Sequence, residues 1–224
     1  MCGRYSLTSP GEAMARLFGV AMGEHAPRYN IAPSQGILVA RAAPDGEAGA
    51  REAAVLRWGL VPSWAKDPDI GNRMINARAE TVAEKPSFRA AFRRRRCLVP
   101  ASGFYEWRAA SGPKQPYHIG MADGGPFAMA GLWEHWTGPD GAAVETCAIL
   151  TTEANELLRP IHARMPVIVA PGDFDLWLDP ELAMPELLAP LLRPFDPAAM
   201  AARAVSRHVN NVRNDDPACL EPVD

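Results

Sequence analysis

Cys2 offers the most reactive pair of groups in this sequence. Cys2 follows Met1 and precedes Gly3. A second residue as small as cysteine permits removal of an initiator methionine, which would leave a free amine and a thiol on Cys2. The reference pKa is about 8 for an α-amino group and about 8.5 for a thiol, so both are partly nucleophilic near neutral pH. On Cys2 alone, a small side chain packed in a first strand is the better interpretation, because free cysteines are usually buried and inert.

Three other groups of polar residues could supply acids, bases and hydrogen bonds. NARAET occupies residues 76–81, GFYEW residues 103–107 and HARMP residues 162–166, each in apolar surroundings. Their candidates for chemistry are Asn76, Glu106 and His162, the last with a reference pKa near neutrality. Each also has a structural interpretation: Asn76 as a helix N-cap, Glu106 as a carboxylate paired with an arginine, and His162 as a hydrogen-bonded loop residue.

The order of the motifs along the chain resembles that of the SOS response-associated peptidase (SRAP) family. The resemblance runs from residue 2 to about residue 222 and rests on MCGRY, RYNIAP, WGLVPSWA, NARAET, GFYEW, HARMP and VSRHVNNVRND. It implies a protein that senses abasic sites in single-stranded DNA and links to them through the N-terminal cysteine. The amine of Cys2 would add to the C1′ aldehyde of the ring-opened sugar, water would leave to give an imine, and the sulfur would close a thiazolidine ring.

The same resemblance implies roles for the polar residues. Glu106 would shuttle protons between amine, sugar and leaving water, His162 would assist opening of the sugar ring, and Asn76 would hold the reacting amine or a sugar hydroxyl. An imine at C1′ also acidifies the C2′ protons and invites strand cleavage, which fast closure by the thiol would suppress. We therefore expect a self-modifying, lyase-like enzyme that shields the lesion, with autocatalytic removal of Met1 as its peptidase-like step.

The family also implies a surface that binds the DNA backbone. Arg4, Arg78 and Arg164 lie within the motifs, and they would contact phosphates flanking the lesion, positioning the strand without reading bases. The arginines of residues 93–96 fit a solvated helix end, with general attraction for DNA as the alternative.

Three further residues would touch the strand around the lesion. Trp64 would stack on a base, with Pro33 as a wedge beside it, and Thr151 would line the site. A lid over the core is a second interpretation of Trp64. Some relatives carry another aromatic residue after this tryptophan, where the present chain has Ala65.

Two rival functions fit part of the sequence. In an N-terminal-nucleophile peptidase or amidotransferase, the sulfur of Cys2 would attack an amide while its own amine serves as the base, and an MCG start fits this too. A DNA-binding module without covalent chemistry is the other rival. Incubation with abasic single-stranded DNA, followed by a search for a stable adduct, separates these possibilities.

The first half of the chain alternates short elements with loops that carry motif residues. Ser9 and Pro10 predict a helix N-cap and first turn, with the helix ending at Phe18. Residues 27–35 read as a loop, 37–40 and 53–58 as strands around a surface turn, and 61–73 as a long irregular loop that carries Trp64. Residues 77–96 predict two short helical pieces split at Pro86.

The second half predicts strands separated by turns. CLVP, GFYEWR, PYHIG, FAMAGLWEHW and VETCAILTT follow one another at about ten-residue spacing, typical of antiparallel sheets or a barrel. MPVIVA and AVSRHV read as strands, and DFDLWL and PELLAPLL as helices. We expect one domain, residues 1–224, with an α+β fold that has an antiparallel, barrel-like β core and peripheral helices.

The bulk properties set the remaining expectations. The net charge is −3, but residues 1–108 carry 16 Lys+Arg against 10 Asp+Glu (+6), and residues 109–224 carry 7 against 16 (−9). A basic face for DNA is therefore possible, although a genome rich in Arg and Ala is the simpler cause of the many arginines. The cysteines and histidines show no ligand-like spacing, so we expect no metal, cofactor or disulfide. Without a signal peptide or an apolar span, we expect a monomer in the bacterial cytoplasm, at the nucleoid when bound to DNA.

Overall fold

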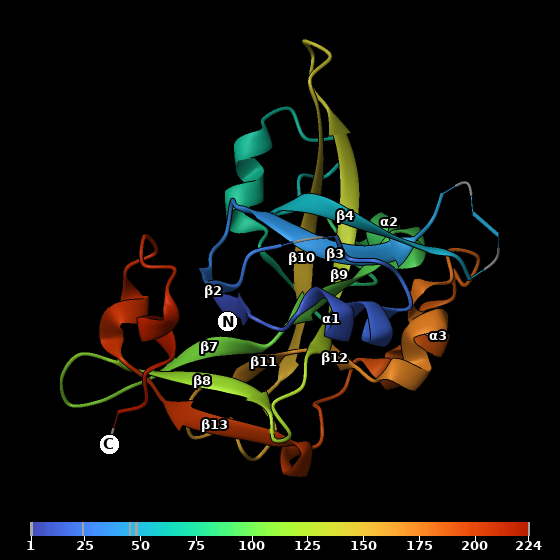
Figure 1. Ribbon diagram of the computed structural model, residues 1–224. Coiled ribbons are helices and arrows are strands. Elements are labelled where there is room, and N and C mark those ends of the chain that lie inside the picture. Colours follow the sequence, from blue (N-terminus) through green and yellow to red (C-terminus); the bar gives the residue numbers. More distant parts are fainter. Residues whose placement is uncertain (1, 24, 45, 48, 224) are drawn as a thin grey trace.

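A closed ring of five strands forms the core of the fold (Figure 1). The structure is a computed structural model that describes residues 2–23, 25–44, 46–47 and 49–223. The ring runs β10–β4–β3–β6–β9 and closes through β9 and β10. Its pairings are antiparallel except that β4 and β10 are parallel. The barrel strands are β3 (Gly36–Ala42), β4 (Arg51–Trp58), β6 (Arg96–Ala101), β9 (Phe127–Thr137) and β10 (Ala143–Glu153).

A second, fully antiparallel sheet lies beside the barrel. Its order is β13–β8–β7–β1–β2, and it places the N-terminal strand between β2 and the strand that carries GFYEW. The chain passes directly from β6 of the barrel into β7 of this sheet, so the two units share one buried interior. Its strands are β1 (Tyr5–Leu7), β2 (Arg28–Ile31), β7 (Gly103–Arg108), β8 (Gln115–Met121) and β13 (Met200–Ala204).

Two short strands flank the end of β10 and bring two motifs together. β5 (Asn76–Arg78) pairs with β10 in parallel, with Arg78 opposite Thr151. β11 (Arg164–Pro166) pairs with the same stretch in antiparallel fashion, with Pro166 opposite Thr151. The motifs NARAET and HARMP therefore lie on either side of Thr151. β12 (Ile168–Val169) continues from β11 and pairs with β9.

The helices are short and lie around the sheets. Helix α1 buries Met14 and Phe18 and ends at Gly19, whose φ of 67° favours glycine. Within the described residues, none of the helices has the length and hydropathy needed to cross a bilayer. The α-helices are α1 (Gly11–Phe18), α2 (Arg89–Arg94), α3 (Phe174–Leu178) and α4 (Pro185–Leu188). The 3₁₀ helices are η1 (Pro68–Arg73), η2 (Pro171–Asp173), η3 (Ala189–Leu191), η4 (Pro197–Ala199), η5 (Arg207–Asn210) and η6 (Pro217–Leu220).

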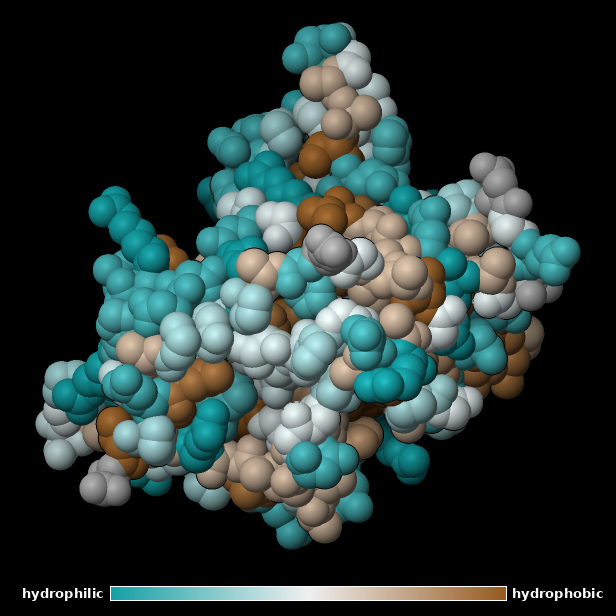
Figure 2. Space-filling model, viewed as in Figure 1, coloured by the Kyte–Doolittle hydropathy of each residue, from teal (hydrophilic) through white to brown (hydrophobic). Residues whose placement is uncertain are grey.

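The face of the molecule seen in Figure 1 is mainly hydrophilic. Figure 2 shows hydrophobic residues there as small, separate patches. The large aromatic side chains Trp58, Trp177, Tyr5 and Phe104 are fully buried. These residues belong to one buried cluster to which the barrel, the second sheet and α3 all contribute, and burial of its apolar surface is the main stabilising contribution to folding.

The predicted α+β class and barrel-like core are confirmed, and so are the strands expected at 37–40, 53–58 and through the second half up to VETCAILTT. The helices expected in DFDLWL and PELLAPLL are also present. Part of the surface turn expected between β3 and β4, residues 45 and 48, lies outside the described residues.

Four local predictions are wrong. Pro10, not Ser9, is the N-cap of α1, because the Ser9 hydroxyl is hydrogen-bonded to that of Ser102 at 2.8 Å. Part of the loop expected at 27–35 is strand β2. Residues 77–96 contain one helix, α2, because the segment before Pro86 begins as strand β5 against β10 and continues as turns. The strand in AVSRHV ends at Ala204, and η5 follows.

Candidate active site

Strand pairing places β1, the first strand of the chain, between β7 and the edge strand β2 of the second sheet. Cys2 precedes β1, and the Tyr105 N–H donates to the carbonyl of Arg4, which extends the β1–β7 pairing toward the chain end. The Asn76 amide, Nδ2, donates to the Cys2 carbonyl at 2.9 Å. Three segments that are distant in sequence, the N-terminus, β5 and β7, therefore meet at Cys2.

Asn76 has a second polar atom that faces the protein interior. Its Oδ1 is buried and has no hydrogen-bond partner among the described residues. Because an unsatisfied buried acceptor costs free energy, such an atom marks a position where a ligand hydroxyl or amine could donate. The helix N-cap interpretation of Asn76 is wrong, since the residue begins strand β5.

Glu106 and His162 face each other from opposite sides of the site. His162 Nδ1 lies 3.8 Å from Glu106 Oε1; the glutamate is buried and the histidine side chain is 31% exposed. The backbone N–H of Arg164 donates to His162 Nδ1 at 3.0 Å. His162 Nδ1 also lies 3.2 Å from the Arg164 carbonyl, so the backbone of Arg164 holds the ring in either tautomer.

The charged forms of the two central groups are disfavoured. Burial raises the pKa of the Cys2 thiol, and the nearby Glu106 carboxylate raises that pKa further. Burial also raises the pKa of Glu106, while His162 acts in the opposite direction. The thiol is therefore held as S–H in the form of the protein that carries Met1.

Cys2 is fully buried in the chain that carries Met1. Its Sγ contacts the Arg4 carbonyl at 3.9 Å. Met1, whose removal is expected from the sequence, lies outside the described residues. In the unprocessed sequence the Cys2 nitrogen belongs to a peptide bond, so neither the amine nor the thiol is presented to a substrate.

The three arginines expected to contact phosphate differ in their surroundings. Arg78 is exposed on β5. Arg4 donates to Asn30 Oδ1 at 2.8 Å and to the Val209 carbonyl at 2.9 Å.

Arg164 is held more firmly than the other two. It makes a two-point ion pair with Glu80, at 2.6 and 2.9 Å, and donates to the Thr151 carbonyl at 2.6 Å. Arg164 binds a carboxylate in the geometry that it would offer to a phosphate. The sequence did not single out Glu80, although this residue lies within the NARAET motif.

Trp64 is presented on the surface by a loop that is tied to the barrel. The side chain is 58% exposed, so the interpretation as a core lid is wrong. The loop is anchored on one side by Trp136, whose Nε1 donates to the Ala65 carbonyl at 2.7 Å. On the other side, the Val61 N–H donates to Thr146 Oγ1 at 2.8 Å.

The remaining DNA-binding candidates lie in two different settings. Pro33 is half-buried in the turn between β2 and β3, and the next residue, Ser34, donates to Asn72 Oδ1 of η1 at 3.0 Å. This contact ties the Pro33 turn to the loop that carries Trp64. Thr151 is buried in β10 between β5 and β11.

The prediction that residues 93–96 form a solvated helix end is wrong for Arg96. Arg93 and Arg94 are exposed, but Arg96 begins β6 and is buried. Its guanidinium donates to backbone carbonyls at the end of α2 and at α3, including those of Phe92 and Trp177 at 2.6 Å each. Arg96 therefore joins two helices to the barrel and is not a DNA-binding candidate.

Comparison with known protein families agrees with the motif pattern. A family model described as SOS response associated peptidase (SRAP) matches residues 1–212. The chain is 43% identical to the abasic site processing protein YoqW of Bacillus subtilis (strain 168), over 99% of each chain. It is 33% identical to the abasic site processing protein HMCES of Mus musculus, over 100% of this chain and 76% of that protein.

Comparison with solved structures shows the same fold. A crystal structure of a protein from Bacteroides thetaiotaomicron superimposes with a TM-score of 0.86 at 30% identity, covering 99% of this chain and 100% of that one. A protein from Bordetella bronchiseptica gives 0.78 at 27% identity, covering 92% and 100%.

Proposed function

Because the chain belongs to the SOS response-associated peptidase family, we propose that it processes abasic sites in single-stranded DNA by linking them covalently to Cys2. The observation that carries this proposal is the convergence on Cys2 of Asn76, at 2.9 Å from its carbonyl, and of the Glu106–His162 pair. Two relatives that cover most of the chain carry the name abasic site processing protein.

The reaction begins at the amine that removal of Met1 exposes. The Cys2 nitrogen attacks the C1′ aldehyde of the open sugar, the carbonyl oxygen leaves as water, and a C=N bond results. The sulfur then adds to the same carbon, and the proton from the thiol ends on nitrogen. The product is a five-membered thiazolidine, and one water molecule is lost overall.

The surrounding residues match the proton movements that these steps need. Glu106, with a pKa raised by burial, can both accept a proton from the attacking amine and deliver one to the leaving water. His162 can protonate the ring oxygen of the closed sugar. Asn76 can accept a hydrogen bond from the amine or a sugar hydroxyl through its buried Oδ1.

The DNA would be held without reading its sequence. Arg4, Arg78 and Arg164 would contact flanking phosphates and Trp64 would stack on a base, with Pro33 beside it and Thr151 at the lesion. To bind a phosphate, Arg164 would have to hold Glu80 and the phosphate together or release Glu80. Removal of Met1 is proposed as an autocatalytic step at the same residues, and it would also uncover the Cys2 thiol.

The first test uses a single-stranded oligonucleotide with one abasic site. The processed wild-type protein should give an adduct that survives denaturing electrophoresis. Cys2→Ala should give none, and Cys2→Ser only an imine that borohydride traps, because oxygen closes a far less stable ring. An N-terminal tag that cannot be cleaved should also abolish the adduct.

Cys97→Ala is the matched control, since Cys97 is another buried thiol, located in the barrel, and it should react as the wild type does. A normal yield from Cys2→Ala or from the tagged protein would rule out the proposed amine. Hydrolysis of amide substrates by the processed protein, without any adduct, would favour the N-terminal-nucleophile hydrolase instead.

A further inference from the structure

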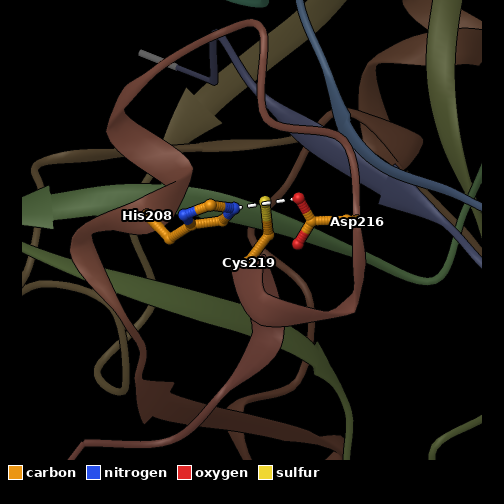
Figure 3. Close-up of side chains that lie close together, drawn as sticks. All are labelled: His208, Asp216 and Cys219. Carbon is orange, nitrogen blue, oxygen red and sulfur yellow. Dashed lines mark hydrogen bonds and ion pairs between the residues drawn. The ribbon is translucent and has the colours of Figure 1, made fainter.

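A cluster of three potential metal ligands lies in the C-terminal segment, away from Cys2 (Figure 3). His208 is in η5, Cys219 is in η6, and Asp216 is the N-cap residue between them. One imidazole nitrogen, one carboxylate oxygen and the sulfur lie within 4.8 Å of one another. His208 Nε2 and Asp216 Oδ2 are 2.9 Å apart. The sequence offered no familiar ligand spacing here, because the three residues meet only through the fold of η5 and η6.

We propose that His208, Asp216 and Cys219 bind one divalent transition-metal ion of the zinc type. Nitrogen, carboxylate oxygen and thiolate sulfur are the donors that zinc takes in proteins. Ligand bonds of about 2.0–2.3 Å in a tetrahedral site place the donor atoms about 3.3–3.8 Å apart. The His208–Asp216 pair, at 2.9 Å, would open slightly, and the sulfur, within 4.8 Å of both, would move closer. On binding, the Cys219 thiol loses its proton to solvent, and His208 binds as a neutral imidazole whose one proton sits on the ring nitrogen that does not face the ion. The thiolate and the carboxylate then balance the charge of the ion.

The geometry is less compatible with a catalytic cysteine. A thiol–histidine–carboxylate triad needs the thiol and the acid on different ring nitrogens. Here Asp216 contacts His208 Nε2, while Asn214 lies 3.1 Å from Nδ1. In Figure 3 the sulfur lies beside the line between His208 and Asp216, and Cys219 is fully buried. The Cys219 thiol donates to the Asn214 carbonyl at 3.4 Å, and its sulfur lies within 4.8 Å of the donor atoms of His208 and Asp216.

Neighbouring groups orient two of the ligands. Asp216 Oδ1 accepts from the Ala218 N–H at 2.9 Å, which leaves Oδ2 directed at His208. The Asn214 amide, Nδ2, donates to the His208 carbonyl at 2.8 Å and lies 3.1 Å from His208 Nδ1, so it holds the imidazole in place from the side away from Asp216. The His208 and Asp216 side chains are 36% and 48% exposed, so an ion and a fourth, water ligand can enter from solvent.

The ion would join η5 and η6, which also contribute to a small apolar cluster. That cluster contains Tyr105, Val205, Val209 and Cys219 as its buried members. Bound metal would stabilise this segment by mass action. This inference does not depend on the chemistry of Cys2.

The test is a titration of the untagged Cys2→Ala protein with Zn²⁺ and Co²⁺, since the N-terminal aminothiol could itself bind metal. One equivalent of Zn²⁺ should bind in competition with a chelating dye and raise the melting temperature. Co²⁺ should give visible bands of a tetrahedral site and a thiolate charge-transfer band. His208→Ala, Asp216→Asn and Cys219→Ala should each weaken binding by at least about tenfold, and Cys219→Ala should remove the charge-transfer band.

His135→Ala and Cys97→Ala serve as controls, and both should bind as the parent does. The proposal is overturned if the parent takes up no stoichiometric ion, or if His208→Ala and Asp216→Asn bind as tightly as the parent. Both of these residues are partly exposed, so their variants remain informative even if Cys219→Ala fails to fold.

Discussion

At the residue scale, two glutamates close to the site differ in their environment and in their expected roles. Glu106 is buried, with a raised pKa, and faces His162 at 3.8 Å. Glu80 is half exposed, and its hydrogen-bonded ion pair with Arg164 lowers its pKa. We propose that the first moves protons in the reaction and that the second controls an arginine that binds phosphate.

We expect Glu106→Gln and Glu80→Gln to separate these roles. Glu106→Gln should slow adduct formation at saturating DNA by on the order of a hundredfold, the typical contribution of a general acid or base, with little change in Kd. Glu80→Gln should leave the saturated rate near the wild-type value and change Kd, because Arg164 loses its partner. Single-turnover rates and fluorescence anisotropy measure the two quantities, and a Glu106→Gln effect confined to Kd would contradict the assignment.

The site residues could be found from sequence through their motifs, but their contacts could not. The motifs contain the candidate residues Cys2, Asn76, Glu106 and His162. The Asn76–Cys2 hydrogen bond and the Glu80–Arg164 ion pair join residues 74 and 84 positions apart, and only the fold determines such pairings. The burial of Arg96 could not be predicted from sequence either. Its arginine neighbours predict a solvated helix end, whereas its side chain is buried against helix carbonyls.

At the element scale, the β9–β10 hairpin supports the loop that presents Trp64. Trp136 of β9 and Thr146 of β10 each hydrogen-bond to that loop. Figure 1 shows this hairpin as the longest projection of the barrel. Strand β10 carries Thr151 near one end. Thr146, which lies nearer the other end of β10, anchors the loop that presents Trp64, the proposed stacking residue.

Loss of either tryptophan should weaken DNA binding without altering the chemistry. Trp64→Ala should raise Kd for single-stranded DNA by about 5- to 150-fold, corresponding to about 1–3 kcal/mol for one stacked base. Trp136→Phe keeps the packing but removes the hydrogen bond to Ala65, so its effect should be smaller and in the same direction. The measurement is anisotropy with an abasic oligonucleotide and the Cys2→Ala protein. An unchanged Kd for Trp64→Ala would exclude stacking.

Strands with a local apolar pattern were predictable, including the short β11 and β12 in MPVIVA, and β2 and β5 were not. The strands β6 to β10 have apolar residues and turn signals that are visible locally. β5 has three residues followed by Ala79 and Glu80, two good helix formers, and it is a strand because β10 pairs with it. β2 lies in a Pro- and Asn-containing segment, and its pairing with β1 determines its conformation in the same way.

At the scale of the whole molecule, a buried histidine couples stability to pH. His118 of β8 lies against Gly103 of β7, where an added Cβ would come within 2.2 Å of the ring. Its Nε2 is 2.9 Å from Ser6 Oγ. Burial, with Arg203 adding to it, lowers the pKa of His118 to about 4.

We expect the free energy of unfolding to fall as the pH drops from about 6.5 to about 4. In this window the unfolded state binds a proton at His118 and the folded state does not, so stability rises with pH. The full loss from this residue is on the order of 3 kcal/mol. Urea titrations at several pH values should show a flatter dependence for His118→Gln than for the wild type, with His135→Gln as the exposed control. Parallel curves for wild type and His118→Gln would contradict the buried, neutral histidine.

The uneven charge of the molecule also bears on DNA binding. The first half carries +6 and the second −9, and the proposed phosphate contacts come mainly from the first. Binding through a few such contacts should weaken steeply with salt and depend little on sequence.

The most direct measurement is intact-mass spectrometry of the protein after reaction with a short abasic oligonucleotide, followed by peptide mapping. We predict a protein without Met1 whose mass increases by that of the oligonucleotide minus one water, with the modification on the N-terminal peptide at Cys2. An adduct at another residue, an adduct on protein that retains Met1, or no adduct with fully processed protein would contradict the proposed linkage.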